Sequence, residues 1–446
     1  KVQEAINDIT RDKIGVEIEL SITDFGSFNQ NTTLALSANE EIDVLACVGF
    51  PYATGIQQGY LSDLEENDLI QTYGQGIIDA VGQENVDACR VNGVLYGLPS
   101  NRDIAQGRGC AAIATEYLDG IGYEANTDDE IVKISLDELN DIYAQLHEKY
   151  PDKEVYRPTT GSMSQFSNVD SLGGNVFGVL LDYGQNLDVV NLFESDFYKD
   201  YCARLYDYNQ KGYISADAST DTTAVGELVK AGTLMSYTTG GKPGIKAQET
   251  TLTGRDMTIF QTLDDYISST SVASMPWTIP ISAQHKEAAM KFLNECYTNA
   301  DIANLLAWGI EGTHYKIGDD GLATYADGVD ASNSGWNHSM GWMMPNQFLT
   351  HVWEGNDPDL WTEMKEFNTN AKVSKASGFS FDSTNVANEL TAVQNVYNEY
   401  QTSVEYGFVD PETGIAEMND KMMTAGLQKI IDEKKAQLAA WQEANK

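Results

Sequence analysis

The sequence predicts an α/β protein with two lobes and a helical C-terminal region, on the evidence of length, composition and alternating segments. The chain has 446 residues, more than one compact domain usually holds. Hydrophobic residues make up 42% of it, which is enough for a core in each of two lobes. Helical and strand-like patterns alternate, as they do in open α/β sheets, where ligands bind beyond the carboxyl ends of strands.

The N-terminal segments follow this alternation closely. Apolar side chains over residues 2–9 have helical spacing, and residues 16–20 alternate apolar and polar side chains as a strand does. Residues 42–48 form an almost continuous apolar run, which predicts a buried parallel strand. Phe50 and Tyr52 follow this run, so we expect them at a strand end that faces a ligand.

The middle and the end of the chain predict loops and helices. Ser135 to Glu138 form a capping box at the start of a helix that Pro151 ends. Residues 159–184 are rich in Ser, Gly and Asn and predict loops. Apolar stripes over residues 386–400 and 423–441 predict C-terminal helices. Because no low-complexity linker is present, we expect short crossings between the lobes.

The charge of the chain excludes several partners. It carries 28 Lys and Arg against 67 Asp and Glu, a net charge of −39. So negative a surface repels phosphate backbones and anionic lipids, and it favours a soluble monomer. No stretch approaches the roughly 20 apolar residues of a membrane span. The chain starts in a helical pattern at Lys1, and we expect that a leader or lipid anchor was removed upstream.

No motif of a known enzyme class is present. The sequence has no G-x-S-x-G elbow, no H-E-x-x-H and no phosphate-binding G-x-x-x-x-G-K-[ST] loop. Its five histidines lack metal-ligand spacing, and the acidic turns at 319–321 and 356–359 do not match a calcium loop. The five scattered cysteines predict small buried side chains without disulfides or zinc. We therefore expect no catalytic residue, no metal and no cofactor. The alternative of a glycosidase stays open, because among 67 acidic residues some pair always has the spacing of a catalytic carboxylate pair.

Tryptophans gather in one segment that is rich in amides. Four of seven fall within 26 residues, at Trp336, Trp342, Trp353 and Trp361. Aromatic rings stack on the apolar face of a sugar, and amides such as Asn337 pair with its hydroxyls. The alternative is that the rings fill a core; the two interpretations are equally supported for Trp336 and Trp342, and a core is favoured for Trp353 and Trp361.

A second candidate follows a short predicted strand that ends near Pro99. Asn101 and Arg102 lie in a stretch too polar for a core, and the guanidinium of Arg102 offers a rigid fork of donors to hydroxyls or a carboxylate. A salt bridge between Arg102 and Asp103 is an equally supported interpretation.

Seven blocks occur in the order and spacing of a known family. They are residues 44–45, 91–99 (VNGVLYGLP), 286–297, 308–315 (WGIEGTHY), 378–382 (GFSFD), 407–410 and 425–441. On these blocks the chain resembles family 1 extracellular solute-binding proteins of ABC importers. Within that family it is most similar to a branch of Gram-positive lipoproteins with a characteristic C-terminal region.

The resemblance implies a type II periplasmic-binding-protein-like fold, in which two α/β lobes joined by hinge strands close on a ligand. Lobe 1 is expected over residues 1–107 and 273–315, and lobe 2 over 108–272 and 316–446. The residues expected at the ligand are Phe50, Tyr52, Asn101 and Arg102 from the first lobe, Trp336, Asn337 and Trp342 from the second, and Trp277 and Glu311 near the crossings.

The function that the resemblance implies is capture of a carbohydrate, in particular an oligosaccharide, in the cleft between the lobes. The partners would be the sugar and the permease subunits of an ABC importer, and the protein would be a cell-surface lipoprotein rather than an enzyme. Two alternatives stay open. One is a binding protein for a peptide or another polar solute, and the other is an unrecognised glycoside hydrolase.

Overall fold

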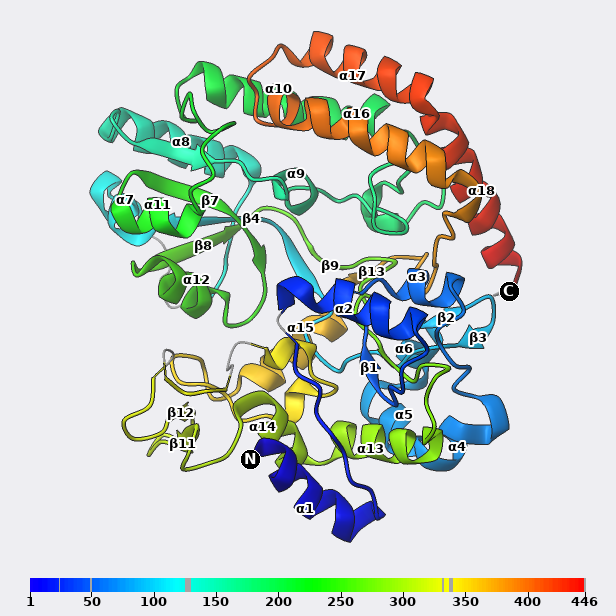
Figure 1. Ribbon diagram of the computed structural model, residues 1–446. Coiled ribbons are helices and arrows are strands. Elements are labelled where there is room, and N and C mark those ends of the chain that lie inside the picture. The colour runs from blue at the N-terminus through cyan, green and yellow to red at the C-terminus, as the bar shows by residue number, and fades with distance from the viewer. Residues whose placement is uncertain (24, 49, 125–129, 331–332, 337–339, 445–446) are drawn as a thin grey trace. The chain divides into compact units, whose positions relative to one another are not determined.

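The computed structural model describes the chain except for residues 24, 49, 125–129, 331–332, 337–339 and 445–446 (Figure 1). The described residues form two compact units, each with its own core. Unit 1 comprises residues 1–104, 270–364 and 377–380, and unit 2 comprises residues 105–269, 365–376 and 381–446.

Unit 1 is built mainly of helices with three short antiparallel strand pairs. The pairs are β1 (Leu45–Ala46) with β10 (Trp277–Thr278), β2 (Arg90–Val91) with β3 (Val94–Leu95), and β11 (Tyr315–Ile317) with β12 (Ala323–Tyr325). Its helices are α1 (Val2–Ile14), α2 (Phe25–Ser37), α3 (Tyr52–Gln57), η1 (Glu66–Asp68), α4 (Leu69–Tyr73), α5 (Gln75–Val81), α6 (Gln83–Asp87), α13 (Lys286–Thr298), α14 (Ala300–Trp308), η4 (Gly341–Met343), η5 (Gln347–Leu349) and the first part of α15 (Leu360–Asn370).

The predicted parallel strand over residues 42–48 is wrong in extent and in direction. Only Leu45 and Ala46 pair, and they run antiparallel to β10. Residues 45–48 are nevertheless buried, which explains the apolar run. An apolar run reports burial on both faces of a segment, but it carries no information about the partner strand or its direction.

The core of unit 1 lies around α13, which packs against α4 and α5. Met290 and Leu293 of α13 meet Ile70 and Ile77 in one cluster of fully buried side chains. A second cluster joins α1 to α13 and α14. The apolar stripes of these helices thus supply the contacts that hold unit 1 together.

Unit 2 contains a mixed sheet of seven strands with the order β13-β9-β4-β7-β6, and β8 and β5 continue from β4. The central strand β4 (Gln106–Ala114) is antiparallel to β7 (Leu234–Gly241) on one edge and to β8 (Met257–Gln261) and β9 (Asp265–Ile267) on the other. The short strands β6 (Glu154–Arg157), β5 (Val132–Lys133) and β13 (Lys372–Val373) are parallel to β7, β8 and β9, respectively.

Helices cover this sheet and extend one end of unit 2. In Figure 1, α16 and α17 lie beside α10, and contacts join these three helices. The helices of unit 2 are α7 (Thr115–Ile121), α8 (Leu136–Lys149), α9 (Ser162–Gln165), η2 (Asp182–Gly184), η3 (Leu192–Glu194), α10 (Asp196–Gln210), α11 (Val225–Ala231), α12 (Ile245–Thr253), η6 (Thr384–Val386), α16 (Ala387–Glu405), α17 (Pro411–Ala425) and α18 (Leu427–Ala444).

Local sequence signals account for the helix ends of unit 2. The predicted capping box at the start of α8 is confirmed: Ser135 Oγ accepts from the backbone N–H of Glu138 at 3.1 Å, and the Glu138 carboxylate accepts from the Ser135 N–H at 2.8 Å. Asp410 caps α17 and Pro411 occupies its first turn. Gly426, with a φ of 113°, separates α17 from α18.

The units differ from the predicted lobes mainly after residue 315. The first two crossings fall at 104–105 and 269–270, three residues before the predicted boundaries. Residues 316–364 were expected in lobe 2, but they pack into unit 1. The reason is aromatic packing on α14, where the rings of Trp308 and Trp353 lie 4.9 Å apart.

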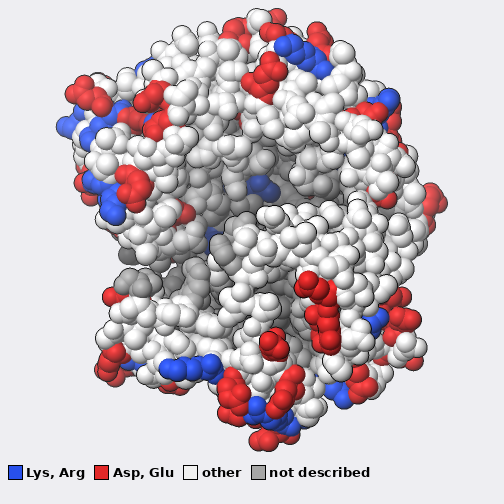
Figure 2. All heavy atoms as spheres, in the orientation of Figure 1, with Lys and Arg blue, Asp and Glu red and all other residues white. Residues whose placement is uncertain are grey.

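The surface and the cysteines agree with the composition. Figure 2 shows carboxylates spread over the surface with fewer basic side chains among them. All five cysteines are buried and free, as predicted. Within the part of the chain that the structure describes, no helix has the length and apolar character needed to cross a bilayer.

Candidate functional site

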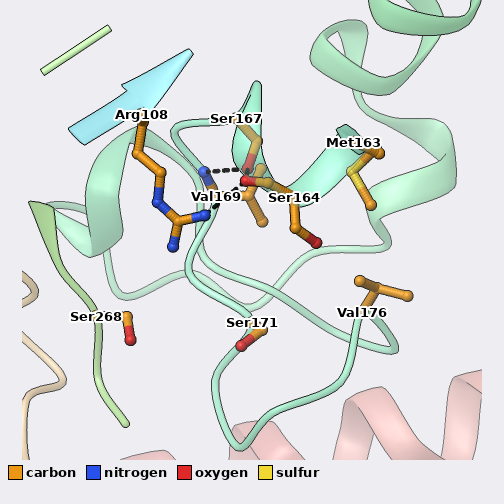
Figure 3. A pocket seen from close by; sticks show the side chains of 8 residues that line it. All are labelled: Arg108, Met163, Ser164, Ser167, Val169, Ser171, Val176 and Ser268. Carbon is orange, nitrogen blue, oxygen red and sulfur yellow. Dashed lines mark hydrogen bonds between the residues drawn. The ribbon is translucent and has the colours of Figure 1, made fainter. Parts of the chain in front are cut away.

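Unit 2 holds a small pocket beside the N-terminal end of β4 (Figure 3). Its cavity volume is about 70 Å³. Pockets that enclose a whole drug-sized ligand measure roughly 300–1,000 Å³, so this pocket accommodates one substituent of a larger molecule. The side chains that line it are Arg108, Met163, Ser164, Ser167, Val169, Ser171, Val176 and Ser268.

A β-bulge presents Arg108 to this pocket. The register of β4 against β7 shifts between Gly107 and Cys110. Gly109 has a φ of 67°, and a Cβ there would lie 2.3 Å from Thr262 Oγ1, so the position requires glycine. A bulge turns one side chain away from the regular alternation of the strand. The sequence Gly-Arg-Gly therefore places the guanidinium at the pocket.

The guanidinium of Arg108 is partly satisfied by the protein. Its Nη1 donates to the carbonyl oxygen of Ser164 at 2.7 Å, and its Cζ lies 5.6 Å from the ring centroid of Tyr266. Its Nε–H is buried and has no hydrogen-bond partner among the described residues. Burial lowers the pKa of Arg108, and the nearby Tyr266 and Asp170 oppose this effect. An unpaired buried donor favours a ligand that brings an acceptor.

Serine hydroxyls and apolar side chains complete the pocket. Figure 3 shows Ser164 and Ser167 next to the guanidinium, while Ser171 lies further along the same stretch and Ser268 comes from a separate segment after β9. Ser167 Oγ donates to the Ser164 carbonyl at 2.7 Å and accepts from the Val169 N–H at 3.4 Å. The pocket thus combines donors, acceptors and apolar walls, and this combination suits a hydroxylated ligand.

Asp170 fixes the segment that carries the serines. Its fully buried carboxylate accepts from Tyr266 Oη at 2.8 Å, Ser269 Oγ at 2.6 Å, and the N–H groups of Ser269 and Leu172 at 2.9 Å each. Four hydrogen bonds saturate a carboxylate. Asp170 therefore acts as a structural tie between this segment and the end of β9.

Two of the predicted ligand contacts, Phe50 and Tyr52, belong to the core of unit 1. Phe50 is 1% exposed and packs with Leu61, and Tyr52 Oη donates to the carbonyl oxygen of Cys89 at 2.7 Å. The prediction relied on a strand end that faces a ligand. The structure instead has a two-residue strand followed by α3, and both rings are buried in one core cluster of unit 1.

Asn101 and Arg102 are held by neighbours within unit 1. Asn101 Nδ2 donates to the Ala80 carbonyl at 3.1 Å. Arg102 Nη1 lies 3.2 Å from Asp103 Oδ1, and Nη2 donates to Ser274 Oγ at 3.0 Å. The salt-bridge interpretation of Arg102 is therefore the one that the structure contains.

Trp277 and Asn101 both donate hydrogen bonds to the short segment of unit 1 that contains Trp342. Trp277 Nε1 donates to the Met343 carbonyl at 3.2 Å, and the Asn101 N–H donates to the Pro345 carbonyl at 2.8 Å. Trp342 is half-buried in η4, the same segment. The structure brings these three residues together, and their contact with a ligand stays a prediction.

The remaining predicted residues are dispersed. Trp336 Nε1 donates to the Leu306 carbonyl at 3.2 Å, and its ring packs against the cluster of α1, α13 and α14. Glu311 is exposed in a turn before β11. Asn337 lies outside the described residues. Trp361, for which a core position was favoured, is half-buried and donates to the Thr350 carbonyl at 2.7 Å.

Arg108 and the serines around it were not among the residues expected at the ligand. A usable signal was present, because glycines on both sides of Arg108 within an apolar strand indicate a bulge. The Ser-rich stretch over residues 159–184 was assigned only to loops. Nothing in either segment indicates by itself that the two meet.

The fold agrees with that of solved solute-binding proteins. The N-glycan transport solute binding protein (NgtS) from Streptococcus pneumoniae superposes with a TM-score of 0.85 at 22% identity, covering 100% of this chain and 96% of that one. Its complex with Man5GlcNAc gives a TM-score of 0.71, with the same identity and coverage. An HMO-binding solute binding protein associated with an ABC transporter, from Bifidobacterium longum infantis, gives 0.65 at 16% identity, covering 97% and 94% of the two chains. The predicted fold class is thereby confirmed.

Sequence comparison points to the same class of protein. A carbohydrate ABC transporter substrate-binding protein from Streptococcus pneumoniae is 25% identical over 97% of this chain and 86% of its own length. Residues 375–443 match DUF3502, a domain of unknown function. The resemblance to solute-binding proteins of ABC importers that the sequence blocks indicated is confirmed by these comparisons.

Proposed function

We propose that this protein captures a carbohydrate outside the cell and delivers it to the permease of an ABC importer. The observation that carries the proposal is the pocket around Arg108, where donors, serine hydroxyls and apolar walls converge. The similarity over 97% of the chain to a carbohydrate ABC transporter substrate-binding protein supports it. The solved relatives include an N-glycan transport solute binding protein in complex with Man1GlcNAc or Man5GlcNAc and an HMO-binding solute binding protein.

The chemistry of the pocket matches a sugar hydroxyl or hydroxymethyl group. Such groups need both donors and acceptors. Arg108 supplies donors only, and serine hydroxyls supply both. Met163, Val169 and Val176 provide an apolar surface for C–H groups. Because a cavity of about 70 Å³ takes one substituent, the rest of the ligand lies outside it, which favours an oligosaccharide.

The proposal includes no catalytic step. Among the described residues no group of three or more His, Cys, Asp or Glu is arranged to hold a metal ion. The buried carboxylates of Asp170 and Glu249 are each occupied by internal hydroxyl donors. The relatives carry the names of binding proteins, which supports a transport role. We further propose a monomer held at the cell surface by an upstream lipid anchor.

A thermal-shift and calorimetric panel tests the proposal. The panel contains mannose- and N-acetylglucosamine-containing glycans, milk-type oligosaccharides and peptides. A ligand at 100 times its Kd stabilises the folded state by about 2.7 kcal/mol, which gives a clear rise in Tm. We expect a rise with an oligosaccharide. A rise with peptides alone would contradict the carbohydrate assignment and favour the peptide alternative.

The hydrolase alternative has its own readout in the same experiment. After prolonged incubation, the bound glycan is recovered by heat denaturation and its mass is measured. Recovery of the intact glycan is the expected result. Release of new reducing ends in proportion to protein concentration would instead establish a glycoside hydrolase.

A further inference from the structure

The C-terminal helix α18 carries a fully buried lysine. The Lys434 side chain has no exposed surface, and its Nζ donates to the carbonyls of Ser171 at 3.1 Å, Asn175 at 3.4 Å and Gly178 at 2.8 Å, and to Asn175 Oδ1 at 3.0 Å. It also lies 5.3 Å from the ring centroid of Phe381. An ammonium has three protons, so four oxygens around it satisfy it completely.

All four acceptors belong to one loop, residues 171–178, which we term the serine loop. A backbone bridge between Asp170 and Leu180 closes this loop, with hydrogen bonds of 2.8 and 3.0 Å. Ser171 and Val176 of the serine loop line the pocket around Arg108. Lys434 of α18 therefore binds the serine loop, which forms one wall of the pocket around Arg108.

The backbone of the serine loop needs such support. Leu172 has a φ of 42°, and Gly173, Gly174 and Gly178 have φ values of 98°, 84° and 91°. A leucine with positive φ is unfavourable and persists only where surrounding contacts fix it. A Cβ on Gly178 would lie 3.2 Å from Lys434 Cδ, so the lysine stem also packs closely against the loop.

We propose that Lys434 is a positioning residue through which the segment matched by DUF3502 shapes the ligand pocket of unit 2. The DUF3502 segment, residues 375–443, contributes no side chain to the pocket lining. Its role in this chain is to insert Lys434 into the serine loop and so keep Ser171 and Val176 in place. The proposal relies on the proposed function only for the choice of ligand.

Substitution Lys434→Met tests this role, with Leu427→Ala as the matched control. Methionine keeps most of the volume of the lysine stem but removes all four hydrogen bonds. Leu427 is fully buried on the same helix, seven residues before Lys434, so its truncation loosens α18 without removing the lysine. Both variants are measured well below their melting temperatures.

Two readouts separate positioning from general stability. In hydrogen–deuterium exchange of the free protein, we expect Lys434→Met to raise exchange over residues 168–181 at least tenfold more than Leu427→Ala does. In calorimetry with the best oligosaccharide of the panel, we expect Lys434→Met to weaken binding at least tenfold and Leu427→Ala less than twofold. Wild-type exchange and affinity in a folded Lys434→Met protein would overturn the proposal.

Two further outcomes have defined meanings. If Lys434→Met does not fold, Asn175→Ala decides, because it removes one acceptor of the Lys434 ammonium without burying an unpaired charge. Asn175 Oδ1 also accepts from the Phe177 N–H at 3.0 Å, so the readout is the exchange of the Asp170 and Leu180 N–H groups that close the serine loop. Wild-type exchange of these two groups in Asn175→Ala would overturn the proposal, and raised exchange supports it. If the wild-type protein binds no glycan, the proposed function fails, while the exchange readout still tests the role of Lys434.

Discussion

The substitution Glu405→Gln is expected to change how stability depends on pH. Glu405 ends α16 and is 1% exposed. Its Oε1 accepts from Tyr397 Oη at 2.7 Å and from Tyr198 Oη at 3.1 Å, and Gln401 donates to Oε2 at 3.2 Å. Burial raises the pKa of Glu405 from 4.5 to about 7, although these hydrogen bonds oppose the rise.

The magnitude follows from the difference between the two pKa values. Each pH unit is equivalent to about 1.4 kcal/mol, so a rise from 4.5 to about 7 corresponds to about 3 kcal/mol. Between these values the native state holds more protons than the unfolded state, and stability therefore falls as pH rises. This contribution is fully present below pH 4.5 and is lost as pH rises through about 7. Glutamine keeps an acceptor for both tyrosines and does not ionise.

A second buried group acts in a different pH window. Burial lowers the pKa of Lys434 from 10.5 to about 7, while Asp170 opposes this effect. The stability linked to Lys434 is present above pH 10.5 and is lost as pH falls through about 7. Below about pH 7 the contribution of Lys434 to the free energy of unfolding no longer changes with pH. Of these two groups, only Glu405 therefore makes stability depend on pH between pH 4.5 and about 7.

The assay is urea denaturation of the wild type, Glu405→Gln and a control at pH 5 and pH 8. Glu399→Gln is the control because Glu399 is exposed on the same helix. Relative to wild type, Glu405→Gln should gain about 2–3 kcal/mol in free energy of unfolding between pH 5 and pH 8, because part of the full difference lies below pH 5. The difference for Glu399→Gln should stay constant within about 0.5 kcal/mol. The same difference at both pH values for Glu405→Gln would refute the reasoning.

Two further substitutions in unit 2 have clear expected outcomes. In Asp170→Asn, an amide N–H₂ replaces one carboxylate oxygen, so some of the four donors around residue 170 lose their acceptor. This should lower the free energy of unfolding by about 2–4 kcal/mol. A melting temperature within 1 °C (roughly 0.3 kcal/mol) of wild type would contradict a stabilising role for the hydrogen bond between Asp170 and Tyr266. Gly407→Ala places a Cβ 2.2 Å from the Leu205 carbonyl oxygen at a φ of 75°, so we expect a loss of about 2 kcal/mol or more. Urea denaturation checks both, and wild-type stability of Gly407→Ala would show that this turn has room for a side chain.

Local signals predicted the helices well because their causes are local. Ser135 and Glu138 satisfy the first N–H groups of α8 within four residues, and Gly426 ends α17 through its own backbone conformation. The apolar run over residues 42–48 correctly indicated burial. It could not give the antiparallel partner at Trp277–Thr278, which lies more than 200 residues away in the chain.

The candidate site was much harder to predict than the fold. An irregular, polar segment that contains a tryptophan has the same composition whether the ring stacks on a sugar or fills a core. In the structure, the indole N–H of Trp336 donates to the Leu306 carbonyl. Arg108 meets Ser164 and the serine loop only through a bulge and a loop closure. Lys434 reaches Gly178 across 256 residues of sequence. A single sequence does not show which distant segments come into contact in the fold.

The central claim, that the pocket around Arg108 binds a carbohydrate, is tested most directly by titrating one oligosaccharide into the wild type and two arginine variants. Arg108→Ala removes the guanidinium of the pocket, and Arg255→Ala removes one from the surface of the same unit, where it pairs with Glu116. Hydrogen bonds to a charged group contribute about 1.5–3 kcal/mol, so Arg108→Ala should weaken binding by about 10- to 100-fold. Arg255→Ala should bind as the wild type does. Equal affinity of Arg108→Ala and wild type for the glycan would contradict the account.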